Sequence, residues 1–418
     1  MGRAIRMYHP PAATLFPGMT LLAGPASPPV PAPLRRDVAG APARAGDPTD
    51  ASPRATPYLE LAPAAAVRRF RRLAAALPGT AVHYAVKANP HPALLGALTT
   101  AGCRFDVAGP TEVRACLAVG ADPADLVHSN PVARRDALAE CAALGVGLFV
   151  VDSPEEAIKL AESAPGSRVL CRIVTSGSGS DWPLSRKYGC SAPQAIEVLA
   201  LAAGLGLRPA GISFHVGSQQ RDPQAWASPI AAAARVFGLL REHGIVLDTL
   251  DLGGGFPAHL EGGALPLAAY GAAIETALRR SFDRADLPRP HTLVEPGRSV
   301  AGDAGRVVAS VVGVLRRGDT RWVYLDAGVF TGMVETLDEA IRYRISTSAD
   351  GGPTGPCVLA GPTCDSADVL YEKQPVQLPL ALAEGDRVVL RSAGAYTTCY
   401  STVGFNGFAP LATVLVDG

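Results

Sequence analysis

From residue 57 onward, short apolar runs alternate with longer amphipathic stretches. Residues 63–76 place Val67 and Phe70 on one side of a helical period, and the Ala/Leu-rich stretch 192–203 also has helical length. Eight apolar runs between such stretches predict strands at residues 81–86, 103–107, 126–128, 147–151, 168–174, 211–216, 247–252 and 292–295. Eight consecutive strand–helix units over about 240 residues predict a closed (β/α)8 barrel of the TIM type, with an open doubly wound sheet as the alternative.

The pattern differs on either side of this region. Beyond residue 300, short β-branched runs separated by Gly, Pro and Asp turns predict a mostly antiparallel β-domain. In the other direction, 12 of the 37 prolines fall within the first 57 residues, which predicts an extended or disordered segment. We therefore divide the chain into a proline-rich leader, 1–56, a barrel, 57–300, and a β-domain, 301–418.

Composition and charge exclude several classes of protein. The 38 basic and 38 acidic residues cancel, so binding to nucleic acid or an anionic membrane through bulk charge is not expected. The sequence has no run of 18 apolar residues, and prolines interrupt the apolar core that a signal peptide would need. The eight cysteines form no C-x-x-C pair, so no metal site is expected, and dispersed thiols are typical of a cytoplasmic protein.

Lysine is scarce among the basic residues. Only Lys87, Lys159, Lys187 and Lys373 are lysines, which leaves 38 − 4 = 34 arginines. Arginine stays protonated in proteins, whereas a desolvated lysine can form an imine with a carbonyl group. Lys87 directly follows a predicted buried strand, where an ammonium group is costly unless it is paired. Taken alone, Lys87 fits an ion-paired lysine and an imine-forming lysine equally well.

Polar residues or glycines follow every predicted barrel strand. In such barrels the active site lies at the C-terminal ends of the strands, so these residues predict a lined pocket. In chain order they are Lys87, Asp106, His128 with Ser129 and Asn130, Asp152, Arg172, His215, Gly253 to Gly255, and Glu295 with Arg298.

The last two strand ends indicate a phosphate site. Three successive glycines, Gly253, Gly254 and Gly255, permit close approach of the backbone to an anion, and a tight turn is the simpler explanation. Arg298, in a Pro-Gly-Arg turn, adds a fork-shaped phosphate partner. Strands seven and eight are the usual phosphate position in these barrels, which favours the joint interpretation.

A lysine, a phosphate cradle, a flat ring and a buried carboxylate together suit pyridoxal 5′-phosphate (PLP). Lys87 would hold the cofactor aldehyde as an imine. Glu295 would keep the pyridine nitrogen protonated, and His215 could stack on the ring. A histidine at such a position is more often an ordinary core residue, so His215 is the weakest part of this set.

Eight ordered motifs in residues 57–418 resemble the fold-type III PLP-dependent decarboxylases, which include ornithine, lysine, diaminopimelate and biosynthetic arginine decarboxylases. Their number and order make the resemblance specific. The motifs are Tyr84–Pro90 (YAVKANP), Phe105–Ala108 (FDVA) with Glu112, Ser213–Ser218 (SFHVGS), Leu252–Pro257 (LGGGFP), Val294–Arg298 (VEPGR), Gly361–Asp365 (GPTCD), Gly394–Tyr396 (GAY) and Phe405–Phe408 (FNGF).

The resemblance implies an alanine-racemase-like barrel, a β-domain and a head-to-tail homodimer that shares its active sites. Lys87, His215 and Glu295 would then be catalytic, and Cys364 of the partner subunit would return a proton after carbon dioxide leaves. The cofactor phosphate would be held by Ser218, Gly254, Gly255, Gly297, Arg298 and Tyr396. Asp106 and Arg172 would lie near the cofactor.

The substrate end of the site is expected to be acidic. Asp365 stands where ornithine decarboxylases of this family carry Asp, which suits a terminal ammonium group. A second acidic position is matched by Glu339 or, one residue earlier, by Asp338, and Phe405 is the fourth expected substrate contact. The stretch from Glu335 to Tyr343 resembles bacterial lysine/ornithine decarboxylases more than animal ornithine decarboxylases.

The expected function is decarboxylation of ornithine or lysine to the diamine, as in polyamine biosynthesis, by a cytoplasmic enzyme. A decarboxylase of a modified amino acid in a specialised pathway is the nearest alternative. A diaminopimelate decarboxylase, an amino-acid racemase and a catalytically dead regulator of the same fold are less favoured. Glu295 argues against a racemase, because related racemases place Arg beside the pyridine nitrogen.

Overall fold

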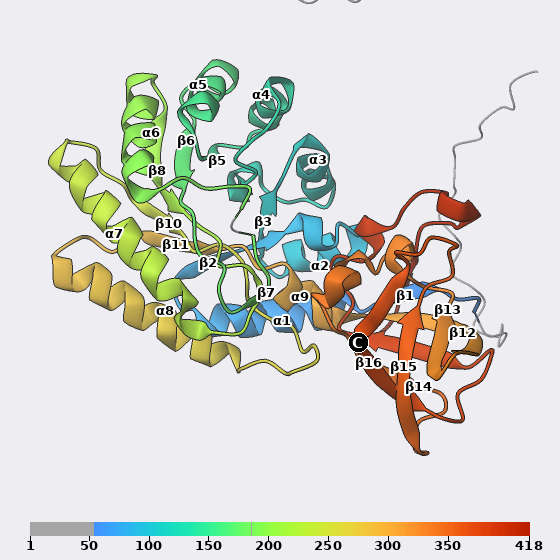
Figure 1. Ribbon diagram of the computed structural model, residues 1–418. Coiled ribbons are helices and arrows are strands. Elements are labelled where there is room, and N and C mark those ends of the chain that lie inside the picture. Colours follow the sequence, from blue (N-terminus) through green and yellow to red (C-terminus); the bar gives the residue numbers. More distant parts are fainter. Residues whose placement is uncertain (1–53, 185) are drawn as a thin grey trace, which may run out of the picture. The chain divides into compact units, whose positions relative to one another are not determined.

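The computed structural model describes residues 54–184 and 186–418 (Figure 1). Residues 1–53 of the predicted leader, and Ser185, lie outside the described residues. Within the described part of the chain, no helix is both long and apolar enough to cross a membrane.

Eight parallel strands close into a barrel, which confirms the predicted fold. Each strand pairs with its neighbours in register; for example, Ala85 on the first lies opposite Asp106 on the second. Because all eight strands are parallel, their C-terminal ends meet at one mouth. The strands, in order around the barrel, are β2 (Thr80–Ala85), β3 (Arg104–Val107), β4 (Leu126–His128), β5 (Leu148–Val151), β6 (Arg168–Arg172), β8 (Arg208–Ser213), β10 (Thr249–Asp251) and β11 (His291–Val294).

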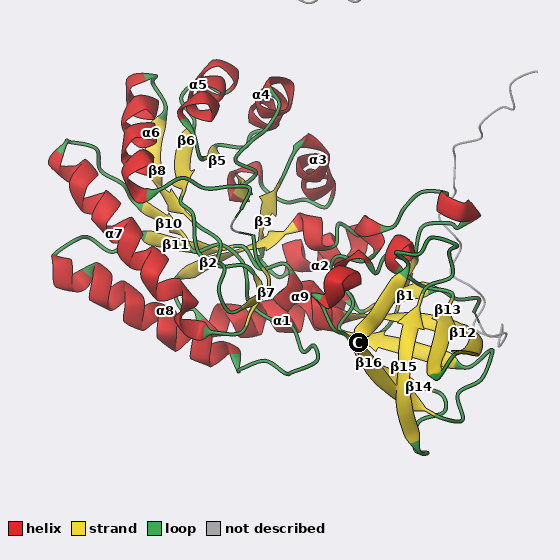
Figure 2. Cartoon of the chain, viewed as in Figure 1, coloured by secondary structure: helices red, strands yellow, loops and turns green. Residues whose placement is uncertain are grey.

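Helices flank the barrel strands on the outside (Figure 2). Helix starts follow familiar sequence signals: Ser153 caps one helix and Ser191 forms a capping box with Gln194 in another. The first helix has the predicted limits 63–76, and the helix predicted at 192–203 runs one residue further. The helices are α1 (Pro63–Ala76), α2 (Pro92–Thr100), α3 (Pro110–Ala118), α4 (Arg135–Ala143), α5 (Pro154–Ser163), α6 (Ala192–Gly204), α7 (Ala227–Glu242), α8 (Leu267–Ser281) and the short α9 (Arg298–Ala301).

A second, mostly antiparallel sheet forms the β-domain. Strand β1 falls within the predicted barrel region by sequence, but it pairs with β12 and β18, so residues 58–61 belong to the second sheet. The strands are β1 (Tyr58–Leu61), β12 (Gly305–Arg317), β13 (Thr320–Leu325), β14 (Arg344–Thr347), β15 (Thr354–Ala360), β16 (Val369–Pro379), β17 (Arg387–Arg391) and β18 (Ala412–Leu415).

Two barrel strands end earlier than predicted, because the chain leaves the barrel earlier. The strands predicted at 168–174 and 211–216 end at Arg172 and Ser213. The segments that follow contribute β7 (Ser180–Trp182) and β9 (Ser218–Gln220), which pair with each other outside the barrel. This small sheet lies next to the barrel mouth and supplies part of the site described below.

Strand β16 has a bulge that the sequence pattern did not reveal. Its pairing with β15 shifts between Cys357 and Leu359, where Val376 and Tyr371 are the partners. The extra residues include Pro375. Proline has no N–H to donate to the neighbouring strand, so it is tolerated in a bulge. The bulge frees backbone N–H groups that a side chain from another segment accepts.

Helix α8 packs closely on α1 at Gly271, where an added Cβ atom would lie 1.9 Å from the carbonyl oxygen of Ala76. We expect Gly271→Ala to lower the free energy of unfolding by about 2 kcal/mol, because backbone must move to admit the methyl group. The matched control is Gly238→Ala on α7, where the nearest atom lies at 3.9 Å; this change should raise stability by up to about 1 kcal/mol. Urea unfolding of both variants measures these changes. If both substitutions change the free energy of unfolding equally, the close packing of α8 on α1 at Gly271 is contradicted.

Candidate active site

Lys87 lies at the barrel mouth in a short 3-10 turn, Val86–Ala88, directly after β2. The register of β2 and β3 brings Asp106 alongside, and the Lys87 ammonium donates a hydrogen bond to Asp106 Oδ2. Burial lowers the pKa of the Lys87 amine, but Asp106, Tyr396 and Glu295 together outweigh this effect, so that pKa lies above its ordinary value. Asp106 Oδ1 is buried and has no hydrogen-bond partner in the described part of the chain.

Glu295, which follows β11, is the second buried carboxyl group at the mouth. The Ser129 hydroxyl, after β4, donates to Glu295 Oε1, and the Glu295 N–H donates to Gly253 O at 2.9 Å. Burial raises the pKa of Glu295 well above its ordinary value, and the neighbouring carboxylates of Asp106 and Asp251 raise it further. A carboxylate here therefore needs a cationic partner to stay ionised.

Asp251, on β10, lies in the same buried cluster and was not among the predicted site residues. Its carboxylate accepts hydrogen bonds from Ser213 Oγ at 2.7 Å and from the Gly253 N–H at 2.9 Å. Burial nevertheless raises the pKa of Asp251 to about 6. Asp251 thereby fixes the first residue of the glycine turn and adds negative potential behind Glu295.

His215 follows β8 and presents its ring at the same mouth. Its Nδ1 accepts a hydrogen bond from the Gly217 N–H at 3.0 Å, which fixes the ring orientation. Burial lowers the pKa of His215 to about 3, with smaller contributions from Arg172 and Lys87. The ring is therefore neutral over the physiological range and suits stacking on a flat ligand.

The glycine turn forms a cradle that leaves no space for side chains. Gly255 has φ +107°, and an added Cβ atom would lie 2.6 Å from Gly217 O. At Gly254 the Cβ would lie 2.6 Å from Glu295 O and 2.9 Å from His215 Nε2, and at Gly297 it would lie 2.6 Å from the Tyr396 hydroxyl. Close packing against neighbouring backbone and side chains therefore requires glycine at these three positions.

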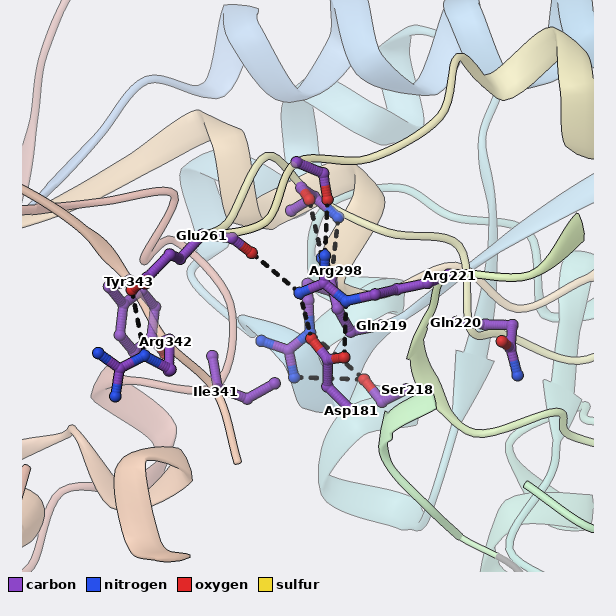
Figure 3. A network of polar contacts seen from close by, with 12 residues as sticks. Asp181, Ser218, Gln219, Gln220, Arg221, Glu261, Arg298, Ile341, Arg342 and Tyr343 are labelled. Atoms are coloured by element: carbon purple, nitrogen blue, oxygen red, sulfur yellow. Dashed lines mark hydrogen bonds and ion pairs between the residues drawn. The ribbon is translucent and has the colours of Figure 1, made fainter. Parts of the chain in front are cut away.

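Arg298 is the first residue of α9 and completes this side of the site. Its guanidinium donates to the Ser218 hydroxyl at 3.2 and 3.3 Å and lies over the Tyr396 ring, 5.0 Å from the centroid. It also forms a two-pronged ion pair with Glu335 of the β-domain, at 2.6 and 2.8 Å. Figure 3 shows Arg298 and Ser218 beside the pair of Arg221 with Asp181.

These side chains share one cavity of about 480 Å³. The barrel contributes Lys87, Ser129, Arg172, His215, Ser218 and Glu295 to its lining. Trp182 through Leu184 and Arg186 through Tyr188 form one wall, and the β-domain adds Glu335, Tyr396 and Tyr400. The structure therefore brings most of the predicted cofactor set together and places Arg172 over the Tyr188 ring, 5.6 Å from its centroid.

The predicted substrate residues lie outside the lining of this cavity. Cys364 and Asp365 are exposed, and the Cys364 thiol donates to Asn406 Oδ1 at 3.2 Å. Phe405 packs against Phe330 with ring centroids 4.7 Å apart. The two acidic candidates of the β-domain are engaged elsewhere, as described next.

Asp338 and Glu339 have left-handed backbones, with φ of 54° and 59°, and point away from the cavity lining. Asp338 accepts from Lys373 Nζ at 3.0 Å on the surface. Glu339 accepts the N–H groups of 372 and 373 in the β16 bulge at 2.7 and 2.5 Å, and also pairs with Arg342 at 2.8 Å. Its carboxylate is committed to holding the β-domain together.

Glu335 is the functional residue that sequence reasoning missed most clearly. It belongs to the same acidic segment as Asp338 and Glu339, but it alone of the three lines the cavity. Side-chain spacing could not separate the three, because the segment forms a 3-10 turn, Val334–Glu339, with a kink at residues 337–338. The available signal was Arg298, because a buried arginine requires a charge partner and Glu335 is an acidic residue that can supply one.

The residues at this site fit PLP. The glycine cradle and Arg298 can take a phosphate, and the unpartnered Asp106 Oδ1 and the high pKa of Glu295 both favour a protonated nitrogen ring nearby. Lys87 supplies the amine that the cofactor aldehyde requires. The cavity thus combines the Lys87 amine and the Glu295 carboxyl group with Ser218 and Tyr396, which contact Arg298.

Comparison with known proteins places the chain in a family. Residues 64–302 match the family model described as "Pyridoxal-dependent decarboxylase, pyridoxal binding domain". This chain belongs to that family of PLP-dependent decarboxylases, the ornithine/arginine decarboxylase group. The resemblance inferred from the sequence motifs and the predicted cofactor are both confirmed.

Bacterial lysine/ornithine decarboxylases are among its relatives. The "Lysine/ornithine decarboxylase" of Selenomonas ruminantium is 33% identical over 363 residues, covering 87% of this chain and 90% of that protein. The lysine/ornithine decarboxylase of Vibrio vulnificus complexed with putrescine matches with a TM-score of 0.77 and 34% identity, covering 86% and 94%. An SrLDC mutant in complex with PLP matches with a TM-score of 0.79 and 34% identity, covering 86% and 91%.

The raised pKa of Glu295 gives a pH-dependent prediction for the cofactor-free protein. Folded Glu295 holds its proton above the ordinary value of 4.5, so its contribution to stability falls as pH rises through that window. Glu295→Gln should therefore flatten the decline in melting temperature as pH rises above about 4.5, and should lower the decarboxylation rate about 100-fold or more.

The control for this experiment is Glu197→Gln, an exposed carboxylate on α6. It should leave both the pH profile and the rate unchanged. If Glu295→Gln keeps the wild-type slope of melting temperature against pH, the burial of an ionisable Glu295 is contradicted.

Proposed function

We propose that this protein decarboxylates a basic L-amino acid, ornithine or lysine, to the corresponding diamine. One observation carries the proposal: the Lys87 amine, paired with Asp106, lines one cavity with Glu295, and Arg298 contacts Ser218 and Tyr396 in the lining of that cavity. Bound PLP supplies an electron sink for the bond to the lost carboxylate. The family, the shared fold and the names of the relatives support the proposal.

The chain's own residues have distinct tasks at this site. Lys87 offers its Nζ to the cofactor aldehyde, and Asp106 holds and takes up the proton that this amine must lose. Glu295 and Ser129 stabilise positive charge on the ring nitrogen, with Asp251 adding negative potential from behind. The neutral His215 ring covers one face of the cofactor and excludes water from it.

Phosphate binding is assigned to groups from both domains. The backbone at Gly254, Gly255 and Gly297 approaches the anion, and the Ser218 and Tyr396 hydroxyls with Arg298 complete its coordination. The Tyr396 N–H donates to Ala88 O at 2.7 Å, so the phosphate cradle and the Lys87 turn are mechanically joined. Anchoring the phosphate in this way sets the distance between the cofactor aldehyde and Nζ.

A homodimer that shares its active sites is part of the proposal. Both carboxylates that line the cavity are already engaged, Glu295 with Ser129 and Glu335 with Arg298. Neither is free for a distal ammonium group. Exposed Cys364 and Asp365 would supply the proton donor and the distal carboxylate from a second copy. Phe405 and Leu337, 38% and 39% exposed, provide apolar surface for such a contact.

A modified amino acid is the second candidate substrate. Glu339, the expected distal partner, is sequestered by the β16 bulge. Arg172, Arg186 and Lys187 instead give the cavity wall a cationic character. This arrangement would suit a substrate with an additional distal carboxylate or carbonyl group.

A substrate panel with Lys87→Ala as the inactive reference tests the proposed chemistry. The wild-type protein should release carbon dioxide from L-ornithine or L-lysine faster than from L-arginine or diaminopimelate. Lys87→Ala should lose activity by about 10⁴-fold or more, because the nucleophilic amine is removed. Lys159→Ala, which breaks an ion pair with Glu156 away from the cavity, is the matched control and should stay active. Turnover of carboxylated analogues alone would favour the second candidate.

Mixing two inactive variants tests the shared site. Lys87→Ala and Cys364→Ala, unfolded together and refolded as a mixture, should recover about a quarter of wild-type activity. Half of the dimers are then hybrids, and one of their two sites carries both intact residues. Neither variant refolded alone should recover. An unchanged rate for Cys364→Ala by itself would show that the thiol takes no part in the reaction.

A further inference from the structure

The ion pair between Arg298 and Glu335 is the most deeply buried charge pair among the described residues. The two side chains are 2% and 6% exposed, and their nitrogen–oxygen distances are 2.6 and 2.8 Å. Planar two-pronged geometry of this kind is the strongest that a guanidinium and a carboxylate make. Burial lowers the pKa of Arg298, but Glu335 more than offsets it, so the arginine stays charged.

The donors of Arg298 are nearly all in use without a cofactor. Nη1 and Nη2 each donate to one Glu335 oxygen, while Nε and Nη2 donate to the Ser218 hydroxyl. The Tyr396 ring covers one face of the guanidinium. The arginine expected to bind the cofactor phosphate therefore already has an anion bound to it.

That anion comes from the other domain. Arg298 begins the helix after the last barrel strand, whereas Glu335 lies in the Val334–Glu339 turn of the β-domain. The Glu335 carbonyl accepts the Ile341 N–H at 3.0 Å, which fixes the turn. Glu335 also lines the Lys87 cavity, so its carboxylate lies at the edge of the phosphate cradle.

Removing one member of a buried pair leaves an uncompensated charge, and this is far more costly than losing both members. If Glu335 lost its charge, Arg298 would be such an unpaired cation. A phosphate bound in the cradle would restore its compensation. The loss of Glu335 therefore destabilises the cofactor-free protein more than the cofactor-bound protein. This difference in stability lowers the Kd for ligands that carry a phosphate.

We propose that Glu335 is an internal counterion that pairs with Arg298 in place of the cofactor phosphate, stabilises the cofactor-free protein and limits its affinity for PLP. Glu335 is thus a positioning residue that acts through Arg298. The proposal rests on the phosphate role of Arg298 assigned above. It adds that cofactor affinity is set partly by a carboxylate of the β-domain.

The test compares PLP with pyridoxal, which has the same ring and aldehyde but no phosphate. In Glu335→Gln, the melting temperature without cofactor should fall. The Kd for PLP, followed by the imine absorbance, should fall about tenfold, equivalent to about 1.4 kcal/mol. The Kd for pyridoxal should not change. Inorganic phosphate should raise the melting temperature of Glu335→Gln more than that of the wild type.

Asp181→Asn is the matched control. Asp181 forms a two-pronged pair with Arg221, at 2.6 and 2.7 Å, close to Arg298 but outside the cavity lining (Figure 3). This variant should lose stability without changing the ratio of the two Kd values. The double variant Arg298→Gln with Glu335→Gln should recover stability in the absence of cofactor, because both charges are gone.

Several outcomes would overturn the proposal. One is that Glu335→Gln binds PLP more weakly than the wild type or with the same Kd. The other is that its Kd values for PLP and pyridoxal change by the same factor. If Glu335→Gln does not fold alone, folding that requires PLP or inorganic phosphate supports the counterion role, and failure to fold with either contradicts it. Arg298→Gln separates the assumptions: if its PLP-to-pyridoxal affinity ratio equals that of the wild type, the assignment of Arg298 to the phosphate fails, whatever substrate is turned over.

Discussion

The barrel mouth confines several ionisable groups to a space with little water, and the site depends on how their charges balance. Lys87 faces Asp106, while Glu295 and Asp251 lie behind in hydrogen-bonded positions. Three carboxyl groups and one ammonium group cannot all be charged at low cost in this environment. Burial raises the pKa values of Glu295 and Asp251, and neighbouring carboxylates raise them further. A protonated nitrogen heterocycle relieves this excess of negative charge, so the same charges that strain the empty protein select the cofactor.

The two domains contribute to one site through different kinds of group. The barrel provides short, rigid connections after its strands, and these place backbone N–H groups and the Lys87 amine. The β-domain provides longer side chains, Tyr396 and Glu335, that reach back to Arg298. In the proposed function, phosphate recognition therefore draws on both domains. A change in the position of the β-domain relative to the barrel would therefore alter cofactor binding before it altered substrate binding.

Much of this site was predictable from the sequence, because apolar runs end where polar residues begin and a parallel barrel gathers those ends at one mouth. Lys87, His215 and Glu295 were placed by that logic alone. The acidic segment of the β-domain was not. Its left-handed residues 338 and 339 reverse the chain direction, so no periodicity indicates that Glu335 turns inward while Glu339 turns to the β16 bulge. The proposed roles of Cys364 and Asp365 would need a second copy of the chain, and only the family resemblance suggested them.

Strand β1 has a consequence for how the chain reaches this fold. Residues 58–61 leave the ribosome before the barrel strands do, but their partners are Gly305 to Val308 and Ala412 to Leu415. The barrel strands can pair while both partners of β1 are still unmade. β1 must wait as an unpaired edge until the last strand, β18, is synthesised, and its closure spans nearly the whole chain. The β-domain therefore cannot be excised as one continuous segment, because its first strand precedes the barrel in the chain and its other strands follow it.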